Sequence, residues 1–186
     1  PLTANNLRDK EQLSILSRIR DLQIDNEGIR GITEGLKGKA RKKLTGLLLA
    51  IGKVKGEGFV SFTQGRIATD FSLHTNVGSL DLSGKLTDNN RFEADINSGR
   101  LLIGKLLGKE DKLGTAAFDL KGKGWLKRNG RPWITFNGNI HQFHYNHHDY
   151  SDISLDATYR NGGFDGSLAI NDPYIALAAK GAFSLE

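Results

Sequence analysis

Apolar and polar residues alternate at every second position, in one stretch after another, from Val54 to the end of the chain. Ile67, Phe71 and Leu73, for example, share one parity, and Asp70 takes the other. A period of two places all the apolar side chains of a β-strand on one face, whereas helical patterns repeat every three or four residues. The alternation therefore predicts an antiparallel sheet with one apolar face and one polar face.

Turn signals rich in Gly, Asn, Asp and Pro separate the alternating segments, so strands that are neighbours in sequence are expected to pair. The nine predicted strands are residues 54–63, 66–76, 78–87, 91–98, 113–122, 133–143, 150–159, 163–170 and 174–185. The segment 101–108 does not alternate, and it predicts one or two helical turns at an end of the sheet.

The first part of the chain has a different character, and we divide the sequence into a mixed helical segment, 1–52, and a β section, 53–186. Apolar residues recur at helical spacing between Leu13 and Ile19, which predicts a helix over about residues 7–20. A short strand over 22–24 is expected to follow.

Two further features are expected before the β section. Asp25 and Asn26 are suitable caps for a short helix that begins near Glu27. A second helix is predicted from about Leu36, and Gly52 is suited to end it. Near its start lies a basic cluster, namely Lys37, Lys39, Arg41, Lys42 and Lys43. Such a cluster is typical of solvated surface, although it also suits phosphate on nucleic acid or lipid headgroups.

The composition sets limits on the class of protein. The chain has 186 residues, a net charge of +5, 23 Gly, three Pro and no Cys, so the compartment cannot be read from disulfide chemistry. The longest apolar run, Leu47–Ile51, is far shorter than the roughly 18 residues of a membrane-spanning helix. Because the chain has no Met and begins with Pro1, we expect an excerpt of a longer protein or a processed product.

The segment that begins at His141 holds the only concentration of metal-ligand residue types. In a regular strand, His141 and Tyr145 would share one face, and His144 and His148 would share the other. A zinc site needs three or four converging ligands, so we favour an exposed His-rich turn over a weak metal pair.

Catalytic motifs are absent from the sequence: it contains no Gly-x-Ser-x-Gly elbow, no catalytic Cys and no P-loop. Carboxylates recur on the polar strand face in a pattern typical of solubility. Phe residues follow the apolar positions and not the basic ones, which disfavours single-stranded nucleic acid. We therefore expect no enzyme activity, no cofactor, no metal and no nucleic-acid partner.

Two stretches resemble the TamB family of translocation and assembly modules, in the AsmA-like superfamily. The first is Leu-Leu-Ile-Gly-Lys-Leu-Leu-Gly at 101–108 with Leu-Gly-Thr-Ala-Ala-Phe-Asp-Leu-Lys-Gly-Lys-Gly at 113–124. The second runs from Phe143 through Tyr145 and residues 150–159 and 163–166 to Asn-Asp-Pro at 171–173. The resemblance covers most of 22–186 and departs from the family pattern at His147 and His148.

The resemblance implies one internal section of a very long envelope protein of a Gram-negative cell. Such a protein is anchored in the inner membrane, outside this section, and crosses the periplasm. Its sheet folds lengthwise into a trough lined with apolar side chains. The implied partners are phospholipid acyl chains moving between the inner and outer membranes, together with outer-membrane proteins or an outer-membrane barrel.

Physical reasoning from the residues favours the same architecture. The predicted helices make up about a quarter of the chain, too little to cover nine strands. We therefore expect a mostly β fold: an antiparallel sheet curled lengthwise into an open apolar trough, β-taco-like, with short N-terminal helices. The residues expected to line the groove are Ile67, Phe71, Leu73, Leu80, Leu82, Phe92, Ile96, Phe118, Leu120, Ile134, Phe136, Ile153, Leu155, Phe164, Leu168, Ile170, Ile175 and Leu177.

The alternative is a closed structural spacer or docking domain, in which the same residues fill a core. An exposed edge strand would then accept client β-strands of outer-membrane proteins.

Overall fold

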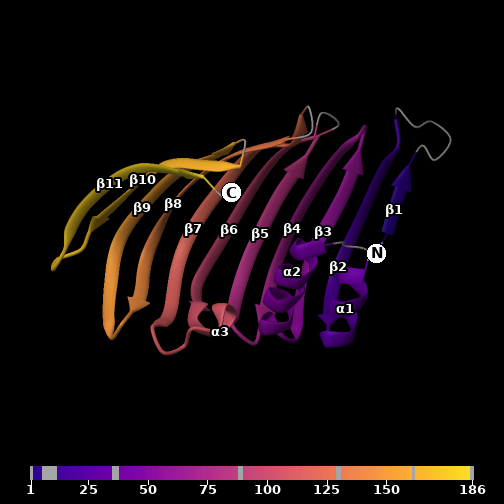
Figure 1. Cartoon of the computed structure of the whole chain (residues 1–186). Helices are drawn as coiled ribbons and strands as arrows, with labels where there is room; N and C mark the ends of the chain where they lie inside the picture. Colours follow the sequence, from indigo (N-terminus) through magenta and orange to yellow (C-terminus); the bar gives the residue numbers. More distant parts are fainter. Residues whose placement is uncertain are drawn as a thin grey trace.

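The computed structural model describes residues 2–5, 12–34, 38–87, 90–128, 131–160 and 162–184. These residues hold eleven strands in one antiparallel sheet, and the spatial order of the strands is their order in sequence, β1 to β11. The sheet is open, because β1 and β11 lie at its two edges, and Figure 1 shows it as a curved surface. The prediction of a mostly β fold with short N-terminal helices is confirmed.

The strands are β1 (Leu2–Asn5), β2 (Ser14–Ile24), β3 (Val54–Thr63), β4 (Arg66–Thr75), β5 (Gly78–Leu86), β6 (Arg91–Leu102), β7 (Leu113–Arg128), β8 (Arg131–Tyr145), β9 (His148–Arg160), β10 (Gly163–Asn171) and β11 (Ala176–Ser184). The helices are α1 (Asn26–Glu34), α2 (Gly38–Ile51) and α3 (Ile103–Leu107). Each of the nine predicted strands corresponds to one of β3–β11, with ends that differ by a few residues. The helical turns predicted at 101–108 are α3, although residues 101 and 102 still belong to β6.

The helix predicted over 7–20 is wrong. Residues 14–24 form β2, which pairs with β3 from Ser14 opposite Thr63 to Ile24 opposite Val54. Residues 7–11 lie outside the described part of the chain. Without β2, the N–H and C=O groups on that side of β3 would have no partner strand. Pairing with β3 therefore outweighs the helical spacing of the apolar residues in this segment. The sheet therefore extends into the segment before residue 53.

The start of α1 and the end of α2 agree with the sequence prediction. The Asp25 carboxylate accepts hydrogen bonds from the backbone N–H groups of Glu27 and Gly28, at 3.1 and 2.9 Å, and so caps α1. Gly52 ends α2 with φ +71°, a left-handed conformation that favours glycine. The start predicted at Leu36 and the side chains of the basic cluster lie outside the described residues.

A small packed core lies where α2 and α3 meet the sheet, and Figure 1 places all three helices toward the same end of the strands. Its buried members are Val77, Leu101, Ala116 and Phe118. Ile51 from α2 and two residues of α3 pack against them, together with partly buried residues of the sheet. No helix in the described ranges is both long enough and apolar enough to span a bilayer.

The turn between β10 and β11 is organised by Asp172, whose side chain is only 2% exposed. Its carboxylate accepts hydrogen bonds from the backbone N–H of Tyr174 at 2.9 Å and from the N–H and hydroxyl of Ser151 at 2.9 and 3.0 Å. These hydrogen bonds, that from Tyr174 foremost, hold the pKa of Asp172 below its ordinary value despite the opposing effect of burial.

Replacement of Asp172 by Ala should lower the melting temperature by a few degrees at neutral pH, because three donors lose their acceptor. A carboxyl whose pKa is lowered by folding stabilises the native state above its ordinary pKa, and this contribution is lost as the pH falls through the lowered value. The difference between wild type and Asp172→Ala should therefore shrink below pH 3.8, the ordinary pKa of the group. Melting curves followed by circular dichroism measure it, and a difference that is constant down to acid pH would contradict this role.

Candidate functional site

One row of residues crosses the sheet from β2 to β11 without changing face, because residues opposite each other in an antiparallel ladder share a face. From strand to strand it contains Ile19, Gly58, Phe71, Leu82, Ile96, Leu120, Gly138, Leu155, Leu168 and Ala179. Every member is apolar or glycine. We call this row the central row, and the surface that carries it the apolar face.

Neighbouring rows place the other predicted groove residues on the same face. One of them contains Phe62, Ile67, Leu86, Phe92, Gly124, Ile134, Tyr159 and Phe164. Further pairs on this face are Leu73 with Leu80, Gly122 with Phe136, Phe118 with Ile140, Ile153 with Ile170, and Ile170 with Leu177. Ile175 precedes β11 and reaches the same surface, where it lines a recess with Ile170 and Leu177.

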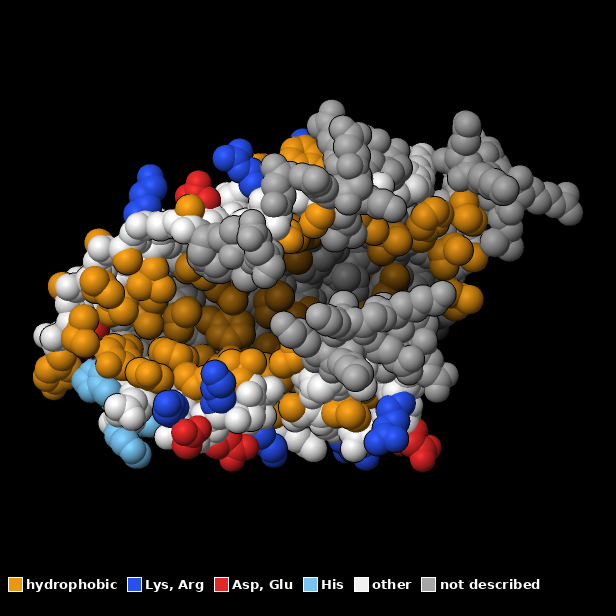
Figure 2. Space-filling view, viewed as in Figure 1, with side chains coloured by type: hydrophobic (Ala, Val, Ile, Leu, Met, Phe, Trp, Pro, Cys, Tyr) orange, Lys and Arg blue, Asp and Glu red, His pale blue; other side chains and the backbone are white. Residues whose placement is uncertain are grey.

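The apolar face is packed at one end and exposed elsewhere. Phe118 is 8% exposed beneath the helices, whereas Ile96 and Phe136 on the same face are 38% and 37% exposed. Figure 2 shows hydrophobic side chains gathered in a hollowed part of the surface, on the side where Figure 1 places β7–β11. The predicted residues thus divide into a group that is covered by protein and a group that remains accessible.

Two recesses lie over the exposed part of the apolar face. The first has a volume of about 520 Å³, and its lining contains Phe136, Leu155, Phe164 and Leu168 together with the charged residues Asp156, Asp165 and Lys180. The second, of about 350 Å³, is lined by Ile140, Phe143, Tyr145, Tyr150, Ile153, Leu168, Ile170, Ile175 and Leu177. Volumes of this size are typical of sites for small apolar ligands.

Gly138 keeps the central row closely packed between β7 and β9. A Cβ atom at this position would lie 2.8 Å from Leu120 Cδ2 and would press on the backbone oxygen of Asp119. The glycine therefore allows the Leu120 side chain to lie across β8. The result is a shallow floor where a larger residue would form a ridge.

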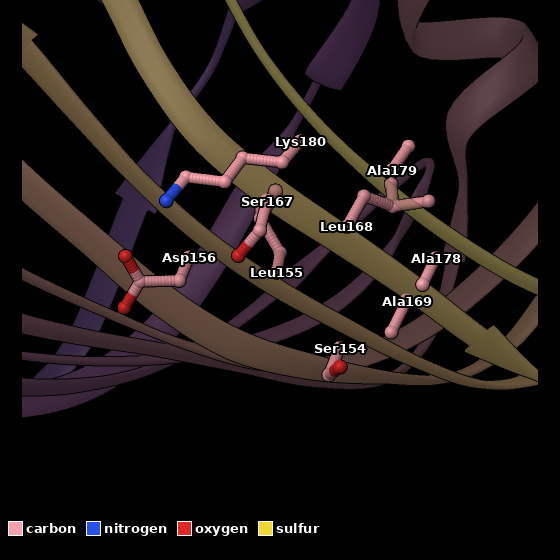
Figure 3. A pocket seen from close by; sticks show the side chains of 9 residues that line it. All are labelled: Ser154, Leu155, Asp156, Ser167, Leu168, Ala169, Ala178, Ala179 and Lys180. Atoms are coloured by element: carbon pink, nitrogen blue, oxygen red, sulfur yellow. The ribbon is translucent and has the colours of Figure 1, made fainter.

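The opposite face of the sheet is polar. Asp156, Ser167 and Lys180 belong to this face, and Figure 3 shows their side chains on the same side of a recess of about 310 Å³ over β9–β11. The register pairs Asp156, Ser167 and Lys180 in a row of their own, next to the row of Leu155, Leu168 and Ala179, which contains no charged residue. A charged side chain in the apolar row would be costly.

The expected facing of the histidines is wrong, because β8 contains an irregularity. The register with β7 shifts so that Phe118 is opposite Ile140 while Ala117 is opposite Gln142. The extra residue, His141, lies on the polar face, where its Nε2 is 2.6 Å from Asp119 Oδ2. Beyond this bulge the parity is reversed, and Tyr145 lines the apolar recess.

His144 and His148 likewise lie apart from each other, each with a different partner. His144 Nδ1 is 2.8 Å from Asp149 Oδ1 on the polar face. His148 packs edge-on against Tyr150, with ring centroids 4.5 Å apart. Within the described ranges, no three His, Cys, Asp or Glu side chains converge as a metal site would require.

The recess around Tyr145 includes four residues that the sequence did not identify as groove residues: Ile140, Phe143, Tyr145 and Tyr150. Ile140 continues the alternation of β8, and that signal was sufficient to find it. Phe143 and Tyr145 follow the bulge, where simple alternation assigns side chains to the wrong face.

Comparisons with protein-family models, with curated proteins and with solved structures find no match to this chain.

Two Phe→Ala substitutions on the apolar face should differ in their cost. Phe118→Ala creates a cavity in the packed core and should lower the free energy of unfolding by about 3–5 kcal/mol. Phe136→Ala removes a side chain that is 37% exposed, and its cost should stay below about 2 kcal/mol. Urea unfolding of both variants measures the difference, and equal losses would show that Phe136 is covered as completely as Phe118.

Proposed function

We propose that the apolar face forms an open trough that binds the acyl chains of phospholipids. In this proposal the chain is a section of a periplasm-spanning envelope protein that carries lipid between the inner and outer membranes and supports outer-membrane assembly. The proposal rests on the unbroken row from Ile19 to Ala179, in which Ile96 and Ala179 are exposed and the other members are half-buried. The resemblance to the TamB family supports the envelope setting.

The energetics of such a trough suit transport better than storage. Burial of one methylene group gains about 0.8 kcal/mol, so a sixteen-carbon chain gains roughly 10 kcal/mol when fully covered and less on an open surface. Because this attraction has no direction and every strand from β2 to β11 offers an apolar or glycine position, a chain meets similar surroundings at each step. The acyl chain can therefore shift along the row without having to escape from a deep energy minimum at any one position.

The charge distribution keeps the headgroup away from the trough. Asp70 and Asp95 both lie opposite Ser83 in register, and Asp156 lies opposite Asn137. All three carboxylates therefore belong to the polar face and not to the apolar rows. A headgroup that remains in water at the rim avoids the desolvation cost of entering the trough. The acyl chain alone would then contact the apolar face.

A single charge in the trough should interrupt acyl binding. Leu155→Asp places a carboxylate in the central row, on β9, and should reduce capture of a photoreactive acyl-chain phospholipid at least tenfold, because an unpaired ion on this surface loses hydration. Ser154→Asp is the matched control, since it adds the same charge to the adjacent residue on the polar face. Circular dichroism establishes that both variants fold. Unchanged capture by folded Leu155→Asp would contradict acyl binding on the apolar face.

A second candidate function rests on β11, which has β10 as a neighbour on one side and forms the edge of the sheet on the other. Exposed edge strands accept partner strands by β-augmentation, and the clients in this case would be β-strands of outer-membrane proteins. The alternation of β11, with Leu177 and Ala179 on the apolar face and Lys180 on the polar face, matches the pattern of such strands.

Docking of a client strand should protect the backbone amides of β11. Hydrogen–deuterium exchange in the presence of a peptide from an outer-membrane β-barrel should slow exchange in residues 176–184 and leave the central strands unchanged. A peptide with the same composition in scrambled order provides the control. Protection confined to the apolar recesses would instead indicate that the peptide binds there as an apolar ligand.

A further inference from the structure

Two tryptophans from neighbouring strands meet on the polar face, opposite the apolar rows. Trp125 of β7 is paired in register with Trp133 of β8, and the ring centroids are 4.7 Å apart with an interplanar angle of 44°. The guanidinium carbon of Arg91 on β6 lies 4.7 Å from the ring centroid of Trp125. We call these residues, with the cations described next, the tryptophan patch.

Lys and Arg residues flank the two rings. The row that contains the tryptophans runs from Arg91 through Trp125 and Trp133 to Arg160. The adjacent row contains Lys85, Glu93, Lys123 and Thr135. These two rows thus combine four cations with one carboxylate, and among the described residues Lys85, Lys123 and Arg160 take part in no ion pair.

A recess of about 470 Å³ accompanies the patch. Its lining contains the cationic residues Lys85, Arg91 and Lys123, the aromatic residues Phe92, Trp125 and Trp133, and one carboxylate, Glu93. The site therefore offers cationic groups and aromatic surface together, which is the combination that proteins present to the headgroup region of a bilayer.

We propose that the tryptophan patch binds the anionic headgroups of a phospholipid bilayer surface. Unpaired cations are complementary to lipid phosphate, and amphipathic indole rings are favourable at the boundary between headgroups and acyl chains. Stacking on nucleobases is a weaker match, because the Arg91 guanidinium covers one face of Trp125 and Trp133 packs against the same ring. This binding goes beyond the acyl trough and does not depend on it, since the patch lies on the other face of the sheet.

The tryptophans provide a direct measurement, because the chain contains only two and both belong to the patch. Titration with phosphatidylcholine vesicles that contain phosphatidylglycerol should shift their fluorescence emission to the blue, and added salt should weaken the shift. Vesicles of phosphatidylcholine alone should give little shift. No shift with the anionic vesicles would overturn the proposal.

Matched variants separate the patch from the net charge of the protein. Lys123→Gln and Arg91→Gln should each weaken vesicle binding severalfold in co-sedimentation, whereas Lys55→Gln, an exposed lysine on β3, removes one charge elsewhere and should leave binding nearly unchanged. Equal weakening by all three variants would indicate attraction to net charge only and contradict a specific site. Circular dichroism confirms that each variant is folded.

Two competitors identify the ligand. Inorganic phosphate that displaces the protein from vesicles at low millimolar concentration would assign the patch to free phosphate. A single-stranded oligonucleotide that quenches the tryptophans more strongly than vesicles shift them would assign it to nucleic acid. Either result would overturn the proposal. Leu155→Asp should reduce acyl capture at least tenfold and leave the vesicle-induced shift intact, so failure of the trough and failure of the patch are distinguishable.

Discussion

The antiparallel register is the constraint on which the rest of the structure depends. Each strand from β2 to β11 presents an apolar residue or glycine to the same row, and the pairing of neighbours transmits this facing across the sheet. A shift of one residue at any junction would turn the following strands over and expose their apolar side chains on the polar face. The register shifts along the sheet leave the central row intact, since β7 and β8 still pair Leu120 with Gly138.

A sheet with one apolar face has to be covered or remain partly exposed, and this protein combines both solutions. The helices α2 and α3 cover one end, where Val77 and Leu101 are buried. Beyond them Ile96 and Leu177 are 38% and 49% exposed, a degree of exposure uncommon for so many apolar residues on one surface. This partly exposed apolar surface is the reason for proposing a ligand there, and the lack of charged residues in the row is the reason for proposing an acyl chain.

Much of the sheet follows from alternation within short segments. The predicted bounds of segment 54–63 are those of β3. Residues of this strand on the apolar face, such as Val60 and Phe62, alternate with polar residues such as Ser61, and this pattern is visible in the sequence. The facing of Leu82 and Leu168 follows from the same rule. Residues 14–20 were misassigned because their apolar spacing also fits a helix, whereas the strand predicted over 22–24 is part of β2. Only pairing with β3, distant in sequence, decides between helix and strand for residues 14–20.

Features that depend on more than one strand could not be predicted in this way. The bulge at His141 results from the match between β7 and β8, and it reverses the facing of Tyr145.

The tryptophan patch was overlooked because the predicted strand ended at residue 122, before Trp125. Continued alternation from Gly122 and Gly124 would have placed Trp125 outward, although its contact with Trp133 requires the hairpin register. The recesses of the apolar face depend on the curvature of the whole sheet, which no local pattern specifies.

The most direct test of the central claim is an NMR measurement of contacts between the protein and a bound acyl chain. A phospholipid with ¹³C-labelled methylenes would be added to protein with labelled Leu and Ile methyl groups. If acyl chains bind on the apolar face, intermolecular NOEs should connect the lipid to Leu82, Leu155 and Leu168, and no contacts should appear to residues of the polar face. NOEs confined to the helices, or lipid that binds without any contact to this row, would contradict it.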